Sequence, residues 1–192
     1  KAHLAKSPFT IWSNDEKYTA DTVIISTGAS ARLLGLESEK ELMGYGVSAC
    51  ATCDGFFFKE KEVLVVGGGD SAAEEAIFLT KFASKVTIIH RRDELRASKI
   101  MQKRVFENKN IEILWNNSVE DILGTKDSGV TGVVLKNTVS GKQKEISCDG
   151  IFMAIGHIPN TKVFKDQIDL DDKGYIITKP GSTNTNIPGV FA

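Results

Sequence analysis

A glycine-rich segment that follows an apolar run constrains the fold of this chain more than any other feature. Residues 63–66 are Val-Leu-Val-Val, a continuous apolar run typical of a strand that is buried on both faces. Residues 67–72, Gly-Gly-Gly-Asp-Ser-Ala, fit the pattern G-x-G-x-x-G/A. A glycine pattern between a strand and a helix predicts a dinucleotide-binding turn. Small and apolar side chains then recur at helical spacing, at Ala72, Ala76, Leu79 and Ala83.

Further apolar runs extend this segment into alternating strands and helices. They predict strands at 86–89, 111–114, 133–136, 144–147 and 150–156, and a helix that carries Ile100, Met101 and Val105. The β-α-β-α-β order of the first part predicts a parallel sheet. The turn at Ser140-Gly141 predicts that the strands on either side of it are antiparallel. We therefore expect an α/β fold with a three-layer, Rossmann-like domain.

The flanking segments have different patterns. Residues 9–12 and 17–20 flank a polar turn and predict a β-hairpin, and residues 22–26 predict a short buried strand. Several glycines within residues 29–46 indicate a connection between units, and Pro159-Asn160-Thr161 interrupts the pattern again. We expect three segments, at residues 1–31, 32–157 and 158–192.

The glycine-rich turn has a specific physical rationale. Gly67 permits a tight turn, Gly69 lets the backbone approach a pyrophosphate, and Ala72 keeps the helix close to the strand. The helix N-terminus, at Asp70 and Ser71, offers unpaired N–H groups and the positive end of a dipole to phosphates. The alternative is a plain glycine turn in which Asp70 or Ser71 caps the helix. On the first interpretation all five residues are candidate dinucleotide contacts.

The end of the next strand indicates which dinucleotide is bound. An NAD site usually has an acidic residue there for the ribose 2′-hydroxyl, whereas this strand ends in His90-Arg91-Arg92, followed by Arg96. Guanidinium groups bind phosphate in bidentate fashion, which favours NADP and its 2′-phosphate. A solvated helix face or a nucleic-acid patch are the alternatives. Aromatic residues for base stacking are not interleaved here, which weakens the second.

Composition argues against two further classes of protein, nucleic-acid binders and membrane proteins. The chain has 24 Lys and Arg against 25 Asp and Glu, and the formal net charge of -1 argues against a globally basic nucleic-acid binder. No apolar run approaches the length of a membrane-spanning helix, and no signal or transit peptide opens the chain. We expect neither nucleic acid nor membrane as a partner.

The three cysteines include one Cys-x-x-Cys, formed by Cys50 and Cys53. Structural zinc would need four ligands, and no second ligand pair accompanies this one, so we expect no metal site. Two thiols at this spacing favour a redox dithiol. Asp54 is then a candidate acid that moves a proton when the disulfide opens, and its alternative is a turn residue with Gly55. Cys148 is interpreted as an inert packing cysteine and Phe56-Phe57-Phe58 as core.

An NADP site and a dithiol in one chain together predict a flavin. NADPH delivers a hydride, and a disulfide is usually reduced through a carrier that accepts the hydride and passes electrons to sulfur. A second G-x-G-x-x-G for FAD is absent from these 192 residues.

The chain resembles the low-molecular-weight thioredoxin reductases of bacteria, plants and fungi. The resemblance covers essentially all of it and rests on several motifs in order. They are residues 50–55 (Cys-Ala-Thr-Cys-Asp-Gly), 67–72, 90–99 (His-Arg-Arg-Asp-Glu-Leu-Arg-Ala-Ser-Lys), 27–30 (Thr-Gly-Ala-Ser), 154–157 (Ala-Ile-Gly-His) and 187–192 (Ile-Pro-Gly-Val-Phe-Ala).

The resemblance implies a cytoplasmic homodimer in which an NADPH domain is inserted into an FAD domain. It implies that NADPH reduces FAD, that FAD reduces the Cys50–Cys53 disulfide, and that the dithiol reduces thioredoxin. Cys53 would face the flavin, Cys50 would attack thioredoxin, and Asp54 would be the acid/base. The cofactor contacts that it implies are Thr27, Gly28, Gly67, Gly69, Asp70, Ser71, Ala72, His90, Arg91, Arg92, Arg96, Ile155, Gly156 and His157. Residues near 28–34 and 157–162 would be hinges between the domains.

Two departures from the family pattern stand out. Leu95 replaces a frequent Phe, and the N-terminal FAD fingerprint and the Gly-Asp segment after Ala192 are missing, so we expect a truncated chain and an incomplete FAD site. The flavoprotein of alkyl hydroperoxide reductase is the nearest rival but usually carries Cys-Pro-His-Cys, and the related ferredoxin-NADP reductases lack the dithiol. An NADPH-binding module without turnover and a redox sensor are the alternatives from other classes.

Overall fold

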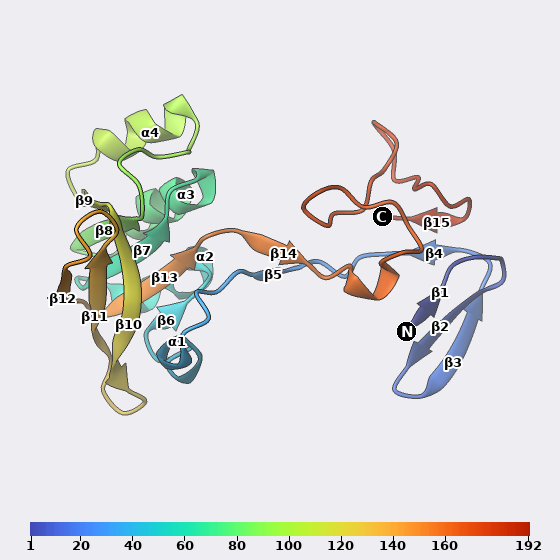
Figure 1. The fold of residues 1–192 in the computed structure, drawn as a ribbon, viewed down its shortest axis with the longest axis horizontal. Helices are drawn as coiled ribbons and strands as arrows, with labels where there is room; N and C mark the ends of the chain where they lie inside the picture. The colour runs from blue at the N-terminus through green and yellow to red at the C-terminus, as the bar shows by residue number, and fades with distance from the viewer. The chain divides into compact units, whose positions relative to one another are not determined.

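The computed structural model describes residues 1–192, which form two compact units (Figure 1). One unit is residues 31–156, and the other combines residues 1–30 with 157–192. None of the helices is both long and apolar enough to cross a membrane.

The unit of residues 31–156 is built on a five-stranded sheet in which every neighbouring pair is parallel, in the order β6-β13-β7-β8-β9. Its strands are β6 (Val47–Ser48), β13 (Gly150–Ala154), β7 (Glu62–Gly67), β8 (Lys85–His90) and β9 (Ile111–Trp115). The predicted parallel sheet is confirmed, and so are its apolar central strands, since all of β13 and residues 63–67 of β7 are buried.

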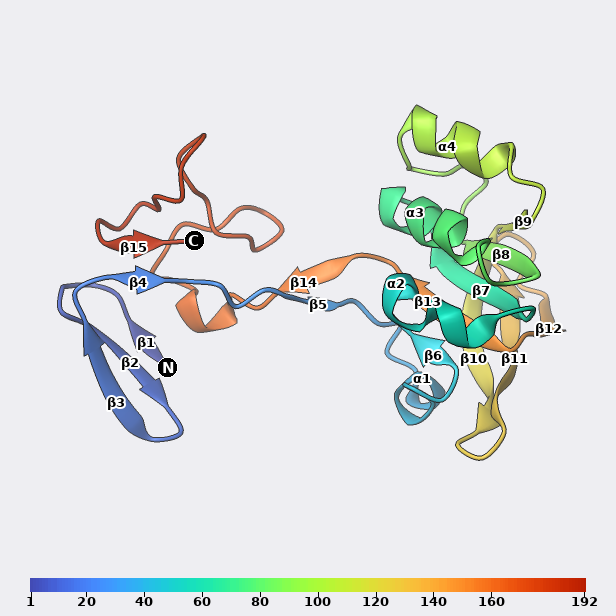
Figure 2. The same ribbon diagram turned by 180° about the vertical axis from the view of Figure 1, so that it is seen from behind.

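Each face of this sheet is covered by a different layer (Figures 1 and 2). Val63 and Val65 of β7 pack among residues of helices α3 (Asp70–Leu79) and α4 (Lys99–Phe106). Leu64 and Val66 alternate to the other face and pack against the antiparallel strands β10 (Asn117–Thr125), β11 (Gly129–Asn137) and β12 (Gln143–Ser147). The expected three-layer α/β fold is therefore confirmed.

Three details of this unit differ from the sequence prediction. Of the three apolar residues from which helix α4 was predicted, only Met101 and Val105 face the core, and Ile100 is exposed. Strand β10 was not predicted, since its polar residues and two register shifts obscure the alternation. The stretch expected to be a connection contains β5 (Ala29–Ala31) and α1 (Glu37–Glu41).

Three short elements precede β7. They are α2 (Ala51–Asp54), the 3-10 helix η1 (Gly55–Phe58) and β6, which pairs with β13. The two ends of the unit are joined by a hydrogen bond, in which the Arg32 N–H donates to the Gly156 carbonyl at 2.8 Å.

The second unit is a set of small sheets. Strands β1 (Ala2–His3), β2 (Phe9–Ser13) and β3 (Glu16–Ala20) form an antiparallel sheet that contains the predicted hairpin. Strand β4 (Val23–Ile24) pairs in parallel with β15 (Val190–Phe191), and β5 pairs with β14 (His157–Pro159), which precedes η2 (Lys162–Phe164). The predicted buried strand over 22–26 is wrong in part, because Val23 and Ile25 are buried while Ile24 is 77% exposed.

Glu39 is a fully buried carboxylate that fixes the chain at the entry to the larger unit. Its Oε1 accepts the Leu34 N–H at 2.9 Å and its Oε2 accepts the Gly35 N–H at 2.8 Å. Two charge-assisted hydrogen bonds from one buried side chain thus hold residues 34–35 on α1.

We predict that Glu39→Ala lowers the free energy of unfolding by about 2 kcal/mol, because both bonds are lost. Urea denaturation followed by circular dichroism measures the effect. Glu37→Ala is the matched control on the same helix, since Glu37 is exposed and its loss should change stability by less than about 0.5 kcal/mol. Equal midpoints for the two variants would contradict the role given to Glu39.

Candidate functional site

The glycine-rich turn joins β7 to α3 through very close backbone packing. A Cβ on Gly67 would lie 2.4 Å from the Ala154 carbonyl oxygen and 2.7 Å from the Ala72 Cβ. Only a residue without a side chain fits between β13 and α3 at this point. The small Ala72, which is completely buried, is the counterpart of this contact on the helix.

Gly68 and Gly69 are glycines for different reasons. A Cβ on Gly68 would lie 2.2 Å from the His90 ring, so the buried imidazole occupies the space that a side chain would need. At Gly69 no atom beyond the adjoining backbone lies within 4 Å of the added Cβ, and its φ of -95° is accessible to any residue. The fold therefore needs Gly68, whereas Gly69 leaves space above the turn.

This space belongs to a pocket of about 380 Å³ at the carboxyl ends of β7, β8 and β13. Its wall combines the turn with residues from four other segments, near positions 32–34, 89–96, 117–119 and 154–156. Among the predicted contacts it includes Gly67, Gly69, Ser71, His90, Arg91, Arg96, Ile155 and Gly156. The edge formed by strand carboxyl ends is where ligands bind in open α/β sheets.

The N-terminus of α3 faces the pocket without a side-chain cap. Gly69 is the N-cap residue and no side chain accepts from the first turn. Asp70 instead accepts the Ser98 N–H at 2.7 Å, and this backbone bond, with a second from the Ser98 side chain, lowers the Asp70 pKa. The alternative in which Asp70 or Ser71 caps the helix is wrong, and the first N–H groups stay free for an anion.

The basic segment after β8 is tied to the same turn. The Gly68 carbonyl accepts the N–H groups of Arg96 at 2.7 Å and Ala97 at 3.1 Å. These bonds hold Arg96 beside the glycines, and both Arg91 and Arg96 have exposed side chains on the pocket wall. His90 has a buried Nε2 without a hydrogen-bond partner, and burial lowers its pKa, so its imidazole is neutral at pH 7.

The structure does not bring every predicted contact to this pocket. Asp70, Ala72 and Arg92 are not among the residues of its wall, and neither is the exposed His157 of β14. Thr27 and Gly28 are exposed in the smaller unit, where their carbonyls accept the side-chain and backbone N–H of Asn160 at 3.1 and 2.9 Å.

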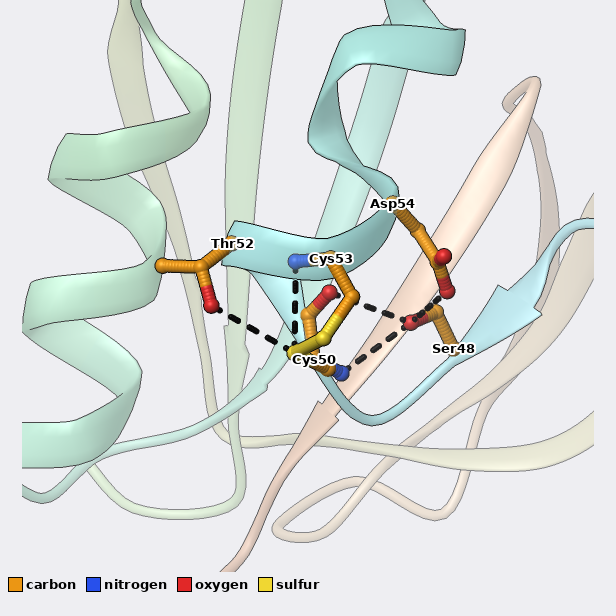
Figure 3. Close-up of a disulfide and its surroundings, with 5 residues drawn as sticks. All are labelled: Ser48, Cys50, Thr52, Cys53 and Asp54. Atoms are coloured by element: carbon orange, nitrogen blue, oxygen red, sulfur yellow. Dashed lines mark hydrogen bonds between the residues drawn. A yellow bond between two sulfur atoms is a disulfide. The ribbon is translucent and has the colours of Figure 1, made fainter.

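A disulfide between Cys50 and Cys53 lies at the start of α2 (Figure 3). Cys50 is the N-cap residue, and its Sγ accepts the Cys53 N–H at 3.2 Å and lies 3.4 Å from the Thr52 hydroxyl. Cys53 is exposed and Cys50 half-buried. Hydrogen-bond donors around one sulfur favour its thiolate once the disulfide opens.

Ser48 links the disulfide turn to Asp54 (Figure 3). Its buried hydroxyl accepts the Cys50 N–H at 3.0 Å and donates to Asp54 Oδ2 at 2.7 Å. Asp54 also lines a second pocket, of about 300 Å³, with Ser48 and Phe57. The carboxylate is therefore held at the end of the same helical turn as the disulfide, and it borders a cavity.

Two expectations for nearby residues have different outcomes. The assignment of all three phenylalanines to the core is wrong, because Phe56 and Phe57 are 67% and 70% exposed and only Phe58 is buried. Cys148 is a buried free thiol, and burial raises its pKa to about 12, as suits a packing residue.

Sequence reasoning missed Ser48 and Gly68. Ser48 precedes the dithiol in a short strand that carries no recognisable motif, and the role of Gly68 depends on a ring 22 positions away.

The family model for pyridine nucleotide-disulphide oxidoreductases matches residues 2–192. The chain belongs to this family. It is 50% identical to a thioredoxin reductase of Rickettsia prowazekii over 194 residues, with 100% of the chain and 63% of that protein covered. A thioredoxin reductase of Coxiella burnetii is 52% identical over 200 residues, covering 100% of this chain and 62% of its own length.

Several solved structures are also similar to this chain. The thioredoxin reductase of Streptococcus pyogenes matches with a TM-score of 0.84 and 44% identity, covering 100% of this chain and 62% of its own. That of Lactococcus lactis matches with a TM-score of 0.84 and 43% identity, covering 96% and 60%. The chain thus spans somewhat less than two thirds of the length of these relatives.

The two glycines allow a direct test of the turn. Gly68→Ala should lower the free energy of unfolding by about 1–3 kcal/mol, because its Cβ overlaps the His90 ring. Gly69→Ala should leave it unchanged or raise it by up to about 1 kcal/mol, because its conformation suits alanine. Thermal unfolding compares the two.

His90→Ala is the matched background for this test. Removing the ring should abolish most of the cost of Gly68→Ala, and the coupling is obtained from the double-mutant cycle. An unchanged cost in that background would show that the clash with His90 is not its cause.

Proposed function

We propose that the protein carrying this chain is an NADPH-dependent thioredoxin-disulfide reductase. Two electrons would pass from NADPH, through FAD, to the Cys50–Cys53 disulfide, and from the resulting dithiol to the disulfide of thioredoxin. The observation that carries the proposal is that the disulfide turn and the nucleotide pocket share one helix. The N-terminus of α3 borders the pocket, while α2 with the disulfide packs against the same helix.

The pocket fits a dinucleotide in several respects. The open space above Gly69 would admit a pyrophosphate, and the uncapped N-terminus of α3 offers N–H groups to it. His90 also lines this pocket, and its buried Nε2 has no hydrogen-bond partner. We assign Gly67, Gly69 and Ser71 to the pyrophosphate side and His90 to the ribose side.

Arg91 and Arg96 are the proposed 2′-phosphate ligands. Both line the pocket, and the bond from the Arg96 N–H to the Gly68 carbonyl fixes their segment beside the pyrophosphate turn. Arg92 and Asp70 lie outside the wall, which supports a secondary role for the first and a structural role for the second. Ile155 and Gly156, on the opposite wall, are proposed to border the nicotinamide half, with His157 next to them in sequence.

The disulfide turn supports the assignment of roles to its residues. We assign the attack on thioredoxin to Cys50, because its sulfur accepts a hydrogen bond from the Cys53 N–H. We assign proton transfer to Asp54. The Ser48 hydroxyl would orient the Asp54 carboxylate relative to the turn. Exposed Cys53 would exchange electrons with the flavin.

The proposed use of FAD rests on the family to which the chain belongs. Thr27 and Gly28 are the proposed flavin contacts in the smaller unit, where Asn160 donates one hydrogen bond to each of their carbonyls. When bound, a flavin would supply the carrier chemistry between a hydride and a disulfide. Assembly as a homodimer and a cytoplasmic location remain predictions from the resemblance.

The second candidate is a disulfide reductase of the alkyl hydroperoxide reductase flavoprotein type. The residues between the cysteines, Ala51 and Thr52, favour thioredoxin reductase over it. An NADPH-binding module without turnover would use the same pocket but leave the disulfide unused.

One assay separates these alternatives. NADPH-dependent reduction of thioredoxin by the parent protein is measured while flavin absorbance is recorded on the same sample. We expect a yellow, active protein whose turnover falls to background in Cys50→Ser and Cys53→Ser and is retained in Cys148→Ala, the matched control at a buried free thiol. Activity without flavin, or activity in either serine variant, would contradict the proposal.

Arg91→Ala tests the 2′-phosphate assignment. Loss of a charge-assisted hydrogen bond to phosphate should raise the KM for NADPH about tenfold or more and change the KM for NADH little, because NADH lacks the phosphate. Arg92→Ala, at the adjacent residue outside the pocket wall, should have a smaller effect. Equal effects of Arg91→Ala on NADPH and NADH would overturn the assignment.

A further inference from the structure

The two arginines proposed to bind the 2′-phosphate lie in a segment without regular secondary structure. This segment, residues 91–98, connects the end of β8 to the start of α4, and we call it the basic loop. A guanidinium binds phosphate through two parallel hydrogen bonds, so its direction of approach matters. A loop that moved freely would have to be ordered when the ligand binds, which would weaken binding. The contacts that hold the basic loop therefore bear on affinity for the phosphate.

Gln102 of α4 holds the basic loop on both sides of Arg96. Its side-chain Nε2 donates to the Leu95 carbonyl at 3.1 Å and to the Ala97 carbonyl at 2.8 Å. From the other direction, the Gly68 carbonyl accepts the N–H groups of Arg96 and Ala97. Gln102 is half-buried, so water competes less for its bonds than at an exposed site. The backbone around Arg96 is thus fixed both by the helix and by the glycine-rich turn.

The turn between β11 and β12 holds the other end of the basic loop. The Thr138 hydroxyl donates to the Arg91 carbonyl at 3.1 Å, although the two residues are 47 positions apart in the sequence. The Thr138 N–H donates to the Asn116 carbonyl at 2.8 Å, and the Asn116 N–H donates to the Arg92 carbonyl at 3.1 Å. These three bonds join the hairpin, the residue that follows β9 and the start of the basic loop.

The turn that carries Thr138 has its own internal support. The Oδ1 of Asn137 accepts the Val139 N–H at 3.1 Å and the Ser140 N–H at 2.8 Å. The Asn137 carbonyl accepts the Gly141 N–H at 2.8 Å. Side-chain bonds from asparagine to the following backbone stabilise a turn. Thr138 therefore meets the basic loop from a hydrogen-bonded turn.

We propose that Gln102 and Thr138 are positioning residues that set the preference of this pocket for NADP over NAD. Gln102 holds the backbone at Arg96 and Thr138 holds it at Arg91, so that both guanidinium groups meet the 2′-phosphate with little further ordering. Neither Gln102 nor Thr138 belongs to the wall of the pocket, so each acts through its arginine. The inference rests on the proposed assignment of the two arginines to that phosphate.

The first test compares Thr138→Val with Thr131→Val in the parent protein. Valine has nearly the shape of threonine but no hydroxyl, and Thr131 is the matched control because it is an exposed threonine of the same hairpin, on β11. Isothermal titration calorimetry gives the Kd of NADP+ and of NAD+, which differ only in the 2′-phosphate and carry no hydride to transfer. Loss of one exposed hydrogen bond should raise the NADP+ Kd about threefold and leave the NAD+ Kd unchanged. Thr138→Ser, which keeps the hydroxyl, should restore the NADP+ Kd.

Gln102→Met tests the bonds around Arg96 with little change in side-chain length. Both bonds are lost, so the NADP+ Kd should rise about fivefold while the NAD+ Kd changes little. Gln143→Met, at an exposed glutamine of β12, is the matched control and should change neither. Because the two side chains hold different arginines, their effects should multiply to about fifteenfold in the double variant. At saturating NADPH, kcat should stay within about twofold of the unsubstituted protein, because only binding is affected.

An unchanged NADP+ Kd in either variant would overturn the role given to that residue. Equal losses of NADP+ and NAD+ affinity would overturn the inference as well, because a merely structural role would weaken both. A parent protein that binds NADP+ no better than NAD+ would overturn the 2′-phosphate assignment and this inference together. If Arg91→Ala abolishes the preference for NADP+ but Thr138→Val and Gln102→Met retain it in full, the inference fails and the assignment stands.

Discussion

The close approach of three backbones at Gly67 is the constraint on which the larger unit depends. There β7, β13 and α3 meet with no room for a Cβ, because the Ala154 carbonyl and the Ala72 methyl group already fill the space. This contact aims the N-terminus of α3 at the edge of the sheet and leaves its first N–H groups facing the pocket. The Gly68 carbonyl then fixes Arg96 beside it, so the geometry of the anion site follows from one junction.

The same helix also supports the disulfide turn. Gly55, at the start of η1, lies against Leu79 near the end of α3, and a Cβ there would come within 3.2 Å of the leucine. Ala51 is buried against this layer, while Ser48 ties the Cys50 backbone to Asp54. One ten-residue helix therefore contacts a phosphate-type pocket at its first turn and a disulfide along its side. A shift of α3 would therefore move residues of both the pocket and the disulfide turn.

The sequence was sufficient for the features that local patterns specify. Apolar runs such as residues 63–66 are governed by burial on both faces, and the glycine pattern is local, so the parallel sheet and its turn could be predicted. Contacts between segments that are far apart in the sequence could not be predicted, because no local pattern specifies them. The dependence of Gly68 on the His90 ring arises only after the sheet brings those two segments together. Phe56 and Phe57 were misassigned because hydrophobicity alone does not say which face of a short 3-10 helix a ring occupies.

The hydrogen bond from the Arg32 N–H to the Gly156 carbonyl has a consequence for the history of such chains. When the first and last residues of a domain are neighbours, the domain can be inserted into another domain at a single surface turn. It can be gained, lost or exchanged as a block while the host keeps its own strand pairings. The 126 residues between these boundaries, 31–156, therefore have the architecture of a transferable cassette.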